Sequence, residues 1–263
     1  MFNISDIALI ASIESDRINL NSQLNTVATA RLYESEAIRC FKSWRTKAGW
    51  LKDIPIYCLC CTKNTPSQKT IDKLKELNVT YIEDYNPDVE KFSSGFLTIP
   101  YVGKYFETIK PIKENITIKI DLDNCLLKPF PEKLINEVYN KVIVGQYNDE
   151  YDIQERFCYN TYPFDTSLII THRKHNFYSL YYDLCFDENV LNSKEWTLIK
   201  SLYGDYWLEE FVVDYIYYYK LSNILCVQNY QYGYDYPTLE WFIKNKKLDG
   251  LYLSHSHIGR QNE

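Results

Sequence analysis

The chain has 263 residues, a net charge of −6 and 46% hydrophobic residues, enough for one sizeable core. The acidic balance disfavours a general nucleic-acid-binding protein, because such proteins carry an excess of basic residues. No run of 18 apolar residues occurs and the N-terminal apolar run lacks a basic leader, so we expect neither a transmembrane helix nor a signal peptide.

The first third of the chain predicts alternating strands and helices. Apolar segments at 7–13, 55–61 and 79–82 predict buried strands. Helical spacing of apolar residues predicts helices over about 26–44 and 67–78, with Pro66 near the first turn of the second. The order β-α-β-α-β is typical of an open parallel sheet.

The remaining elements extend this α/β pattern. The near-continuous apolar character of 116–120 predicts a central strand buried on both faces. Further helices are predicted around 103–109, 131–139, 176–186 and 207–220, and further strands at 141–145, 164–171, 224–229 and within the last 16 residues. No repeat or Gly/Ser-rich linker divides the chain, so we expect a single domain over 1–263.

Two aspartates, Asp121 and Asp123, directly follow the predicted central strand. Ligands of open α/β sheets bind outside the carboxyl ends of the strands. Carboxylates at i and i+2 of an extended chain point to the same side and repel, unless one is protonated or a cation lies between them. Carboxylate oxygens suit Mg²⁺ or Mn²⁺, which leave positions open for phosphate oxygens. The alternative is an Asp-x-Asp that caps a turn.

Three segments resemble the GT-A glycosyltransferases, distantly the glycogenin-like families. KIDLDNCLLKPF resembles their Asp-x-Asp segment, and FDTSLII resembles a later Phe-Asn-Ser/Thr-Gly strand, with Asp165 at the Asn position and Ser167 in place of Gly. The final SHSHIG resembles a histidine-bearing segment that supplies a further metal ligand. Its spacing departs from His-x-x-Gly, so whether His255 or His257 is that ligand stays open.

The resemblance implies a GT-A fold with a Rossmann-like, mostly parallel sheet flanked by helices. Residues 1–123 would be the nucleotide-binding half and 124–263 the acceptor-binding half. The implied activity is metal-dependent transfer of a sugar from a UDP- or GDP-linked donor to a hydroxyl of a glycan or glycoprotein. Mn²⁺ or Mg²⁺ would bind at Asp121, Asp123 and His257 or His255.

Further residues are candidates for the donor and for catalysis. Ser12 and Asp84 end strands where a ribose or nucleobase would lie, Arg31 and Lys104 could neutralise the diphosphate, and Asp121 and Asp165 lie in the resembling motifs. For these residues, turn residues or surface charges are the alternative. Asp205, Glu209 and Glu210 are candidate bases for the acceptor hydroxyl, or else helix-capping and first-turn charges. Inversion and retention both stay open.

Two other functions compete with this interpretation. DLDNCLL also resembles the first motif of haloacid-dehalogenase phosphatases, in which Asp121 would be the nucleophile and Asp123 the acid/base around Mg²⁺. Cys125 in place of a hydroxyl residue, the mid-chain position and the lack of a strand before Asp205 argue against it. The third candidate is a catalytically inactive sugar-binding module on the same fold.

Cysteine and tyrosine usage bear on location and source. Of the eight cysteines only Cys58, Cys60 and Cys61 cluster, within one predicted strand, which disfavours a zinc site and predicts reduced thiols in a cytoplasmic protein. The 25 tyrosines and eight glycines, with abundant Asn, Ile and Lys, match the bias of AT-rich coding. This bias suggests a large DNA virus or an AT-rich microbe, and a viral protein would act in the host cytoplasm.

Overall fold

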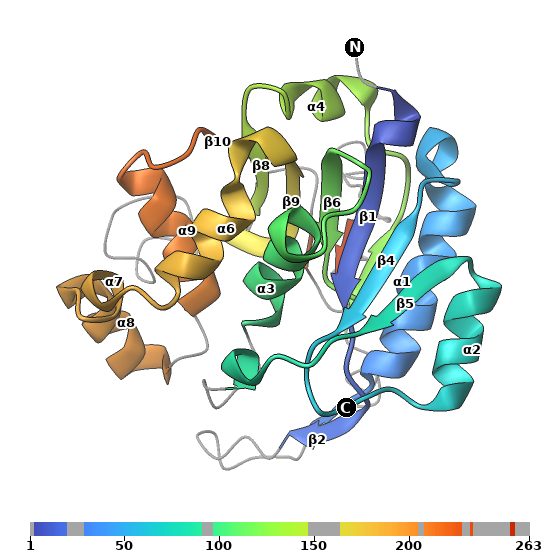
Figure 1. The fold of residues 1–263 in the computed structure, drawn as a ribbon, viewed down its shortest axis with the longest axis horizontal. Coiled ribbons are helices and arrows are strands. Elements are labelled where there is room, and N and C mark those ends of the chain that lie inside the picture. Colours follow the sequence, from blue (N-terminus) through green and yellow to red (C-terminus); the bar gives the residue numbers. More distant parts are fainter. Residues whose placement is uncertain are drawn as a thin grey trace, which may run out of the picture.

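The computed structural model describes residues 3–19, 29–90, 97–146, 164–204, 208–227, 232–233 and 253–255. These ranges contain a seven-stranded sheet that carries helices on both faces (Figure 1). The predicted α/β class with a mostly parallel central sheet is therefore confirmed. Within the same ranges, no helix has the length and apolar character needed to cross a membrane.

The sheet is parallel except at one strand. In spatial order its strands are β10 (Ile224–Val227), β8 (Val142–Gln146), β9 (Phe164–His172), β6 (Ile116–Ile120), β1 (Ile7–Ser12), β4 (Ile56–Cys60) and β5 (Val79–Glu83). β9 runs antiparallel to both of its neighbours, β6 and β8. β6 lies between β1 and β9, which confirms the prediction that it is a central strand.

The predicted β-α-β-α-β unit is present as β1, α1 (Tyr33–Lys47), β4, α2 (Gln68–Glu76) and β5. The first helix starts later than predicted, because Thr29–Arg31 forms strand β3, which pairs with β2 (Arg17–Asn19). Asp16 Oδ1 accepts a hydrogen bond from the Glu34 backbone N at 2.8 Å, which satisfies a first-turn donor of α1.

The start of α2 also differs slightly from the prediction. Pro66 lies outside the helix, because Ser67 is the N-cap and accepts the Thr70 backbone N. A serine hydroxyl at this position satisfies a backbone donor that the helix itself leaves unpaired.

The helices of the second half mostly lie where the sequence predicts them. These helices are α3 (Thr98–Lys104), α4 (Glu132–Glu137), α6 (Phe177–Leu184) and α9 (Leu208–Tyr218). α3 starts earlier than predicted and continues into a π-helical turn, Tyr105–Ile109. Two helices were not predicted, α7 (Glu188–Leu191) and α8 (Lys194–Tyr203). Their signals are the N-caps Asp187 and Ser193, whose side chains accept first-turn N–H groups.

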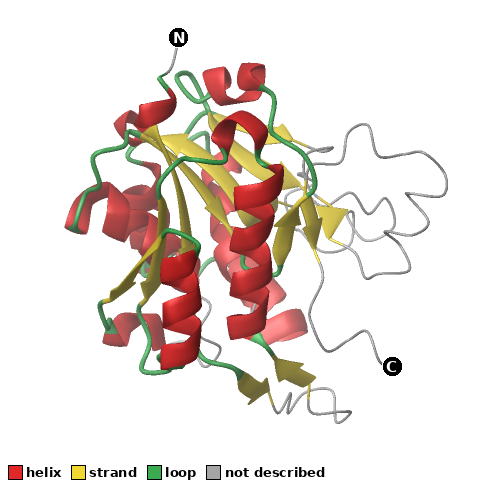
Figure 2. Ribbon diagram, turned by 90° about the vertical axis from the view of Figure 1, so that its right-hand side faces the viewer, coloured by secondary structure: helices red, strands yellow, loops and turns green. Residues whose placement is uncertain are grey.

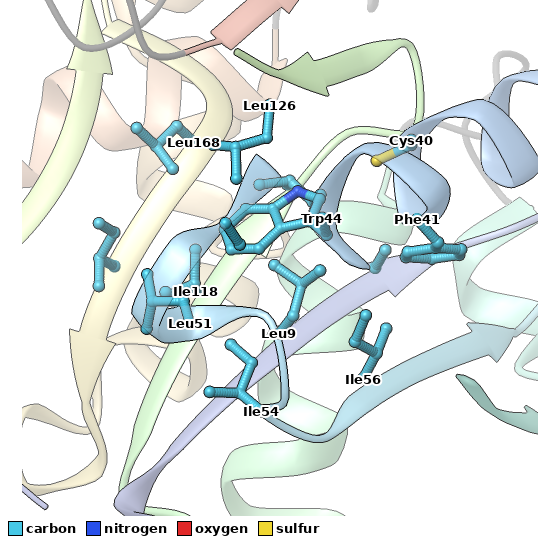
Figure 3. Close-up of a cluster of buried hydrophobic side chains, with 14 of the residues drawn as sticks. Leu9, Cys40, Phe41, Trp44, Leu51, Ile54, Ile56, Ile118, Leu126 and Leu168 are labelled. Atoms are coloured by element: carbon cyan, nitrogen blue, oxygen red, sulfur yellow. The ribbon is translucent and has the colours of Figure 1, made fainter. Parts of the chain in front are cut away.

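The sheet separates two hydrophobic cores. On one face, α1, α2 and α4 pack against alternate residues of the strands, including Leu9 and Ile118. Figure 3 shows Trp44 of α1 in this core, close to Leu9 and Leu126. On the other face, α3, α6, α8 and α9 pack against Ile10 and its neighbours. Figure 2, turned by 90°, shows the twisted sheet behind the helices of the nearer face.

The strand order reverses between β1 and β6. From β1 the chain builds outward through β4 and β5, and β6 then returns to the other side of β1. In open α/β sheets the crevice at the carboxyl ends of two such strands is the usual ligand site. Ser12 ends β1 there, and Asp121 follows β6 directly.

A small second sheet lies beside this point. It contains β11 (Tyr232–Gly233), β12 (Leu253–His255) and β7 (Asn124–Leu126), in that order. β7 starts immediately after Asp123, so both sheets meet at the two aspartates.

Gly103 permits the close contact between α3 and α6. A Cβ built on Gly103 would lie 1.9 Å from Cδ1 of the fully buried Tyr178 ring. We expect Gly103→Ala to lower the free energy of unfolding by about 1–3 kcal/mol, because the packed ring must move, although alanine favours helix. Urea unfolding measures this, with exposed Ser35→Ala as the control; equal stability of Gly103→Ala and wild type would contradict it.

Candidate active site

One face of β6 is polar although the strand is fully buried. Ile116, Ile118 and Ile120 face the core beneath α1, while Thr117 and Lys119 point to the opposite face. The segment therefore alternates between apolar and polar residues, although it is buried on both faces as its predicted near-continuous apolar character implied. Asp121, which follows the strand, extends the polar side.

The central contact of the site is an ion pair between Lys119 and Asp121. The Lys119 side chain is fully buried, and its Nζ lies 2.5 Å from Asp121 Oδ1. Nζ also donates to the backbone O of Thr166 at the start of β9, at 2.8 Å. The Asp121 side chain is 30% exposed, so the pair extends from the interior of the sheet to its surface at the carboxyl end of β6. Loss of one partner of a buried pair costs about 3–5 kcal/mol, because the other charge stays buried.

Asp121 and Asp123 lie on a turn and not on extended chain. The backbone N of Asn124 donates to the O of Asp121 at 3.1 Å, which closes the turn directly after β6. The prediction that both carboxylates point to one side of an extended chain is therefore wrong. The repulsion between the two carboxylates is also reduced without a metal, because the Lys119 ammonium pairs with Asp121.

Two further residues hold the turn. Arg39 of α1 donates to the backbone O of Asp123 at 3.2 Å. The fully buried Asn124 amide donates from Nδ2 to Asp123 Oδ1 at 3.4 Å, and its Oδ1 has no hydrogen-bond partner among the described residues. Neither residue stands out in the sequence, and only their placement against the turn identifies them.

The start of α9 brings two of the three candidate bases to the polar side of β6. Glu210 is half-buried and accepts a hydrogen bond from Thr166 Oγ1 at 3.2 Å. The same threonine supplies its backbone O to Lys119. Glu210, Thr166, Lys119 and Asp121 therefore form one connected network across α9, β9 and β6.

Glu209 is buried beside that network. It is 2% exposed, and its Oε1 accepts the backbone N of Ile99 in the first turn of α3 at 3.3 Å. Burial raises the pKa of the Glu209 carboxyl well above its usual range; Glu210 and Asp121 raise it further, and Lys119 opposes them. These interactions favour a neutral Glu209 that fixes α3 to α9.

Ser12 reaches the same region through α3. Its Oγ donates to Thr98 Oγ1 at 3.4 Å, next to the Ile99 that Glu209 holds. The structure thus brings Ser12, Asp121, Asp123, Glu209 and Glu210 to the carboxyl-end edge of the sheet around β1 and β6. Their sequence positions range from 12 to 210, so the fold is needed to assemble them.

Two other candidates have partners away from this network. Asp84 follows β5 and accepts a hydrogen bond from Lys110 Nζ at 2.9 Å, which lowers the pKa of Asp84. Lys104, at the far end of α3 from Thr98, pairs with Asp183 at 2.6 Å. It also lies 4.5 Å from the centre of the Tyr182 ring on α6. The structure therefore gives Lys104 a partner on α6 and does not bring it to Asp121.

The remaining predicted residues are described in part or not at all. Asp205 and His257 lie outside the described residues. For Arg31 and Asp165 only the backbone is described, in β3 and β9.

His255 is described through its backbone alone, in β12. There it pairs with Asn124, the residue after Asp123. The backbone of His255 therefore lies beside the turn that carries the two aspartates.

The carboxylates on the turn have the right chemistry for a hard divalent cation. Asp121 and Asp123 are both half-buried oxygen donors, and Asn124 Oδ1 is an unpartnered amide oxygen beside Asp123. Across the described residues, no group of three or more His, Cys, Asp or Glu side chains gathers as a metal site. The described part of the turn therefore offers two carboxylates and an amide to Mg²⁺ or Mn²⁺.

No protein-family model matches the chain, and no curated protein matches it.

Glu209 gives the protein a specific pH dependence. Its pKa is raised above the usual 4.5 in the folded state, so the folded protein keeps a proton that the unfolded chain loses above about pH 4.5. This contribution lowers stability as pH rises. Glu209→Gln cannot ionise and keeps an acceptor for Ile99. We expect it to gain stability over wild type as pH rises, by up to about 1.4 kcal/mol per pH unit.

Urea unfolding between pH 5 and pH 7.5 measures this difference. The exposed Glu132→Gln on α4 is the matched control, and its difference from wild type should stay constant with pH. A constant difference for Glu209→Gln as well would show that Glu209 titrates like a solvated carboxyl.

Proposed function

We propose that the protein is a metal-dependent glycosyltransferase of the GT-A type. It would move a sugar from a UDP- or GDP-linked donor to a hydroxyl of a glycan or glycoprotein acceptor. The observation that carries the proposal is the turn with Asp121 and Asp123 at the carboxyl end of β6, next to the end of β1 where the strand order reverses. Sheets of this kind bind nucleotides at that position.

Asp121 and Asp123 would hold Mn²⁺ or Mg²⁺, with a histidine from the segment that β12 brings beside Asn124. A bound divalent cation supplies Lewis-acid stabilisation of the charge that grows on the departing nucleoside diphosphate. The protein's own part is to hold the turn through Arg39 and Lys119. Ser12 lies at the end of β1, where a ribose or nucleobase would bind.

Glu210 is the better placed of the two described candidate bases. Glu209 is buried and engaged with Ile99, whereas Glu210 is half-buried and joined to Asp121 through Thr166 and Lys119. A carboxylate in this position could take the proton of an acceptor hydroxyl in an inverting reaction. The acceptor would then lie over the half of the chain from 124 onward, as the resemblance implies.

The setting proposed for this reaction is the cytoplasm. The described cysteines Cys40, Cys58, Cys60, Cys61, Cys125 and Cys185 are free thiols, which is the state that reducing compartments maintain. The proposed partners are the nucleotide sugar and the acceptor glycan, with no nucleic acid.

Asp123 is the residue on which to test metal-dependent nucleotide binding, because Asp121 also balances the buried Lys119. We expect Mn²⁺ with UDP or GDP to raise the melting temperature of wild type. Ligand at 100 times its dissociation constant stabilises by about 2.7 kcal/mol, or several degrees for a chain of this size. Asp123→Asn should lose this rise while melting normally without ligand.

The exposed Asp72→Asn on α2 serves as the control and should keep the full rise. An undiminished Mn²⁺-dependent rise in Asp123→Asn would contradict the proposed site. Release of phosphate from p-nitrophenyl phosphate, with no stabilisation by nucleotide, would favour the phosphatase interpretation. Nucleotide binding without turnover of any donor would favour an inactive binding module.

Glu210→Gln tests the base. In an inverting enzyme we expect kcat to fall by about 10²–10⁴-fold, with the KM for the donor nearly unchanged, because the proposed base acts on the acceptor hydroxyl. Steady-state kinetics with the identified donor measure both constants, and Glu132→Gln is again the control. A kcat equal to that of wild type would remove Glu210 as the base and favour a retaining course.

A further inference from the structure

Lys119 differs from the other lysines that form ion pairs in the described part of the chain. The side chains of Lys63, Lys73, Lys75, Lys104, Lys110 and Lys113 are 23–80% exposed, whereas that of Lys119 is 0% exposed. Its ammonium is fixed by Asp121 Oδ1 and by the Thr166 backbone O. It therefore places a buried ammonium group immediately behind the proposed metal site.

This charge changes the electrostatics of the turn. Asp121 and Asp123 carry two negative charges, and Lys119 cancels one of them at a separation of 2.5 Å from Asp121. The lysine also occupies one lone pair of Asp121 Oδ1, so the carboxylate has fewer positions left for a metal. A divalent cation close to Asp121 would be repelled by an ammonium that cannot move into solvent, and charges at such separations interact strongly.

From this arrangement, and on the basis of the proposed function, we infer that Lys119 makes metal binding depend on the nucleotide. The protein alone offers too little negative charge to hold Mn²⁺ or Mg²⁺ tightly. The donor diphosphate supplies the missing charge and oxygen ligands, so metal and nucleotide bind as a pair. Because such coupling is reciprocal, each ligand tightens the other by the same factor.

A merely structural role for Lys119 leads to the opposite expectation. If the lysine only supports the turn, its removal disorders Asp121 and weakens metal binding. If the lysine opposes the metal, its removal frees an Asp121 oxygen and takes away a positive charge. Metal binding then becomes tighter, which loss of structure does not produce.

The test measures Mn²⁺ binding without nucleotide, by electron paramagnetic resonance of the free ion, in wild type and Lys119→Met. Methionine keeps most of the buried volume without the charge. We expect Lys119→Met to bind Mn²⁺ at least tenfold more tightly than wild type, because the repulsion of one unit charge a few ångströms from a divalent ion exceeds a factor of about ten even at the dielectric constant of water. In wild type, UDP or GDP should tighten Mn²⁺ binding.

Three variants control the measurement. Lys73→Met removes a lysine that pairs with Glu76 on the surface and should leave Mn²⁺ binding unchanged. Lys119→Met with Asp121→Asn should lose the gain, because the freed carboxylate is gone. Lys119→Gln provides a second neutral variant should Lys119→Met fail to fold, and it should show the same gain.

The outcomes separate the inference from the proposed function. If nucleotide tightens Mn²⁺ binding in wild type but neither folded neutral variant binds Mn²⁺ more tightly alone, the role of Lys119 is overturned and the metal site stands. If wild type binds no Mn²⁺ with either nucleotide, and Asp123→Asn changes nothing, the proposed site itself fails and the inference fails with it.

Discussion

The site depends on a lysine ammonium buried in the middle of a seven-stranded sheet. Lys119 has no exposed surface, so its charge requires partners within the protein. The Asp121 carboxylate and the Thr166 backbone O meet that requirement. Together they fix the end of β6 relative to the start of β9, and Thr166 extends the network to Glu210 on α9. The position of the acidic turn is thus set by charge neutralisation inside the sheet.

The two faces of the sheet differ in composition: one is apolar, and the other carries the polar residues of the proposed site. The face beneath α1 is a continuous apolar core around Trp44 and Phe41, and its packing holds the strands in place. The face beneath α3 and α9 carries the polar residues of β6, and Glu209 joins those two helices through Ile99. Helix N-termini and strand carboxyl ends therefore meet at the same edge, where backbone dipoles and fixed charges can act on a ligand.

The sequence predicted most elements but not their relations. The strands at 7–12, 56–60 and 116–120 agree closely with the prediction, because short apolar runs rich in β-branched residues and bounded by turns rarely form anything but strands. The predicted start of α1 was wrong. The helical spacing of apolar residues continues back into Thr29–Arg31, but these residues form a strand because they pair with β2. The short helices α7 and α8 were missed although Asp187 and Ser193 carry ordinary capping signals.

The sequence by itself determined an α/β chain with two aspartates directly after a central strand, because hydrophobic periodicity and local motifs are properties of neighbouring residues. Only the tertiary structure decided that Asp121 is balanced by Lys119, that Glu209 supports α3 while Glu210 faces the network, and that Lys104 pairs with Asp183 on α6. Apart from the Lys119–Asp121 pair, these contacts join residues 44 to 110 positions apart. They depend on which strands become neighbours and on the face of the sheet where each side chain is buried. The spacing of residues within one element predicts neither.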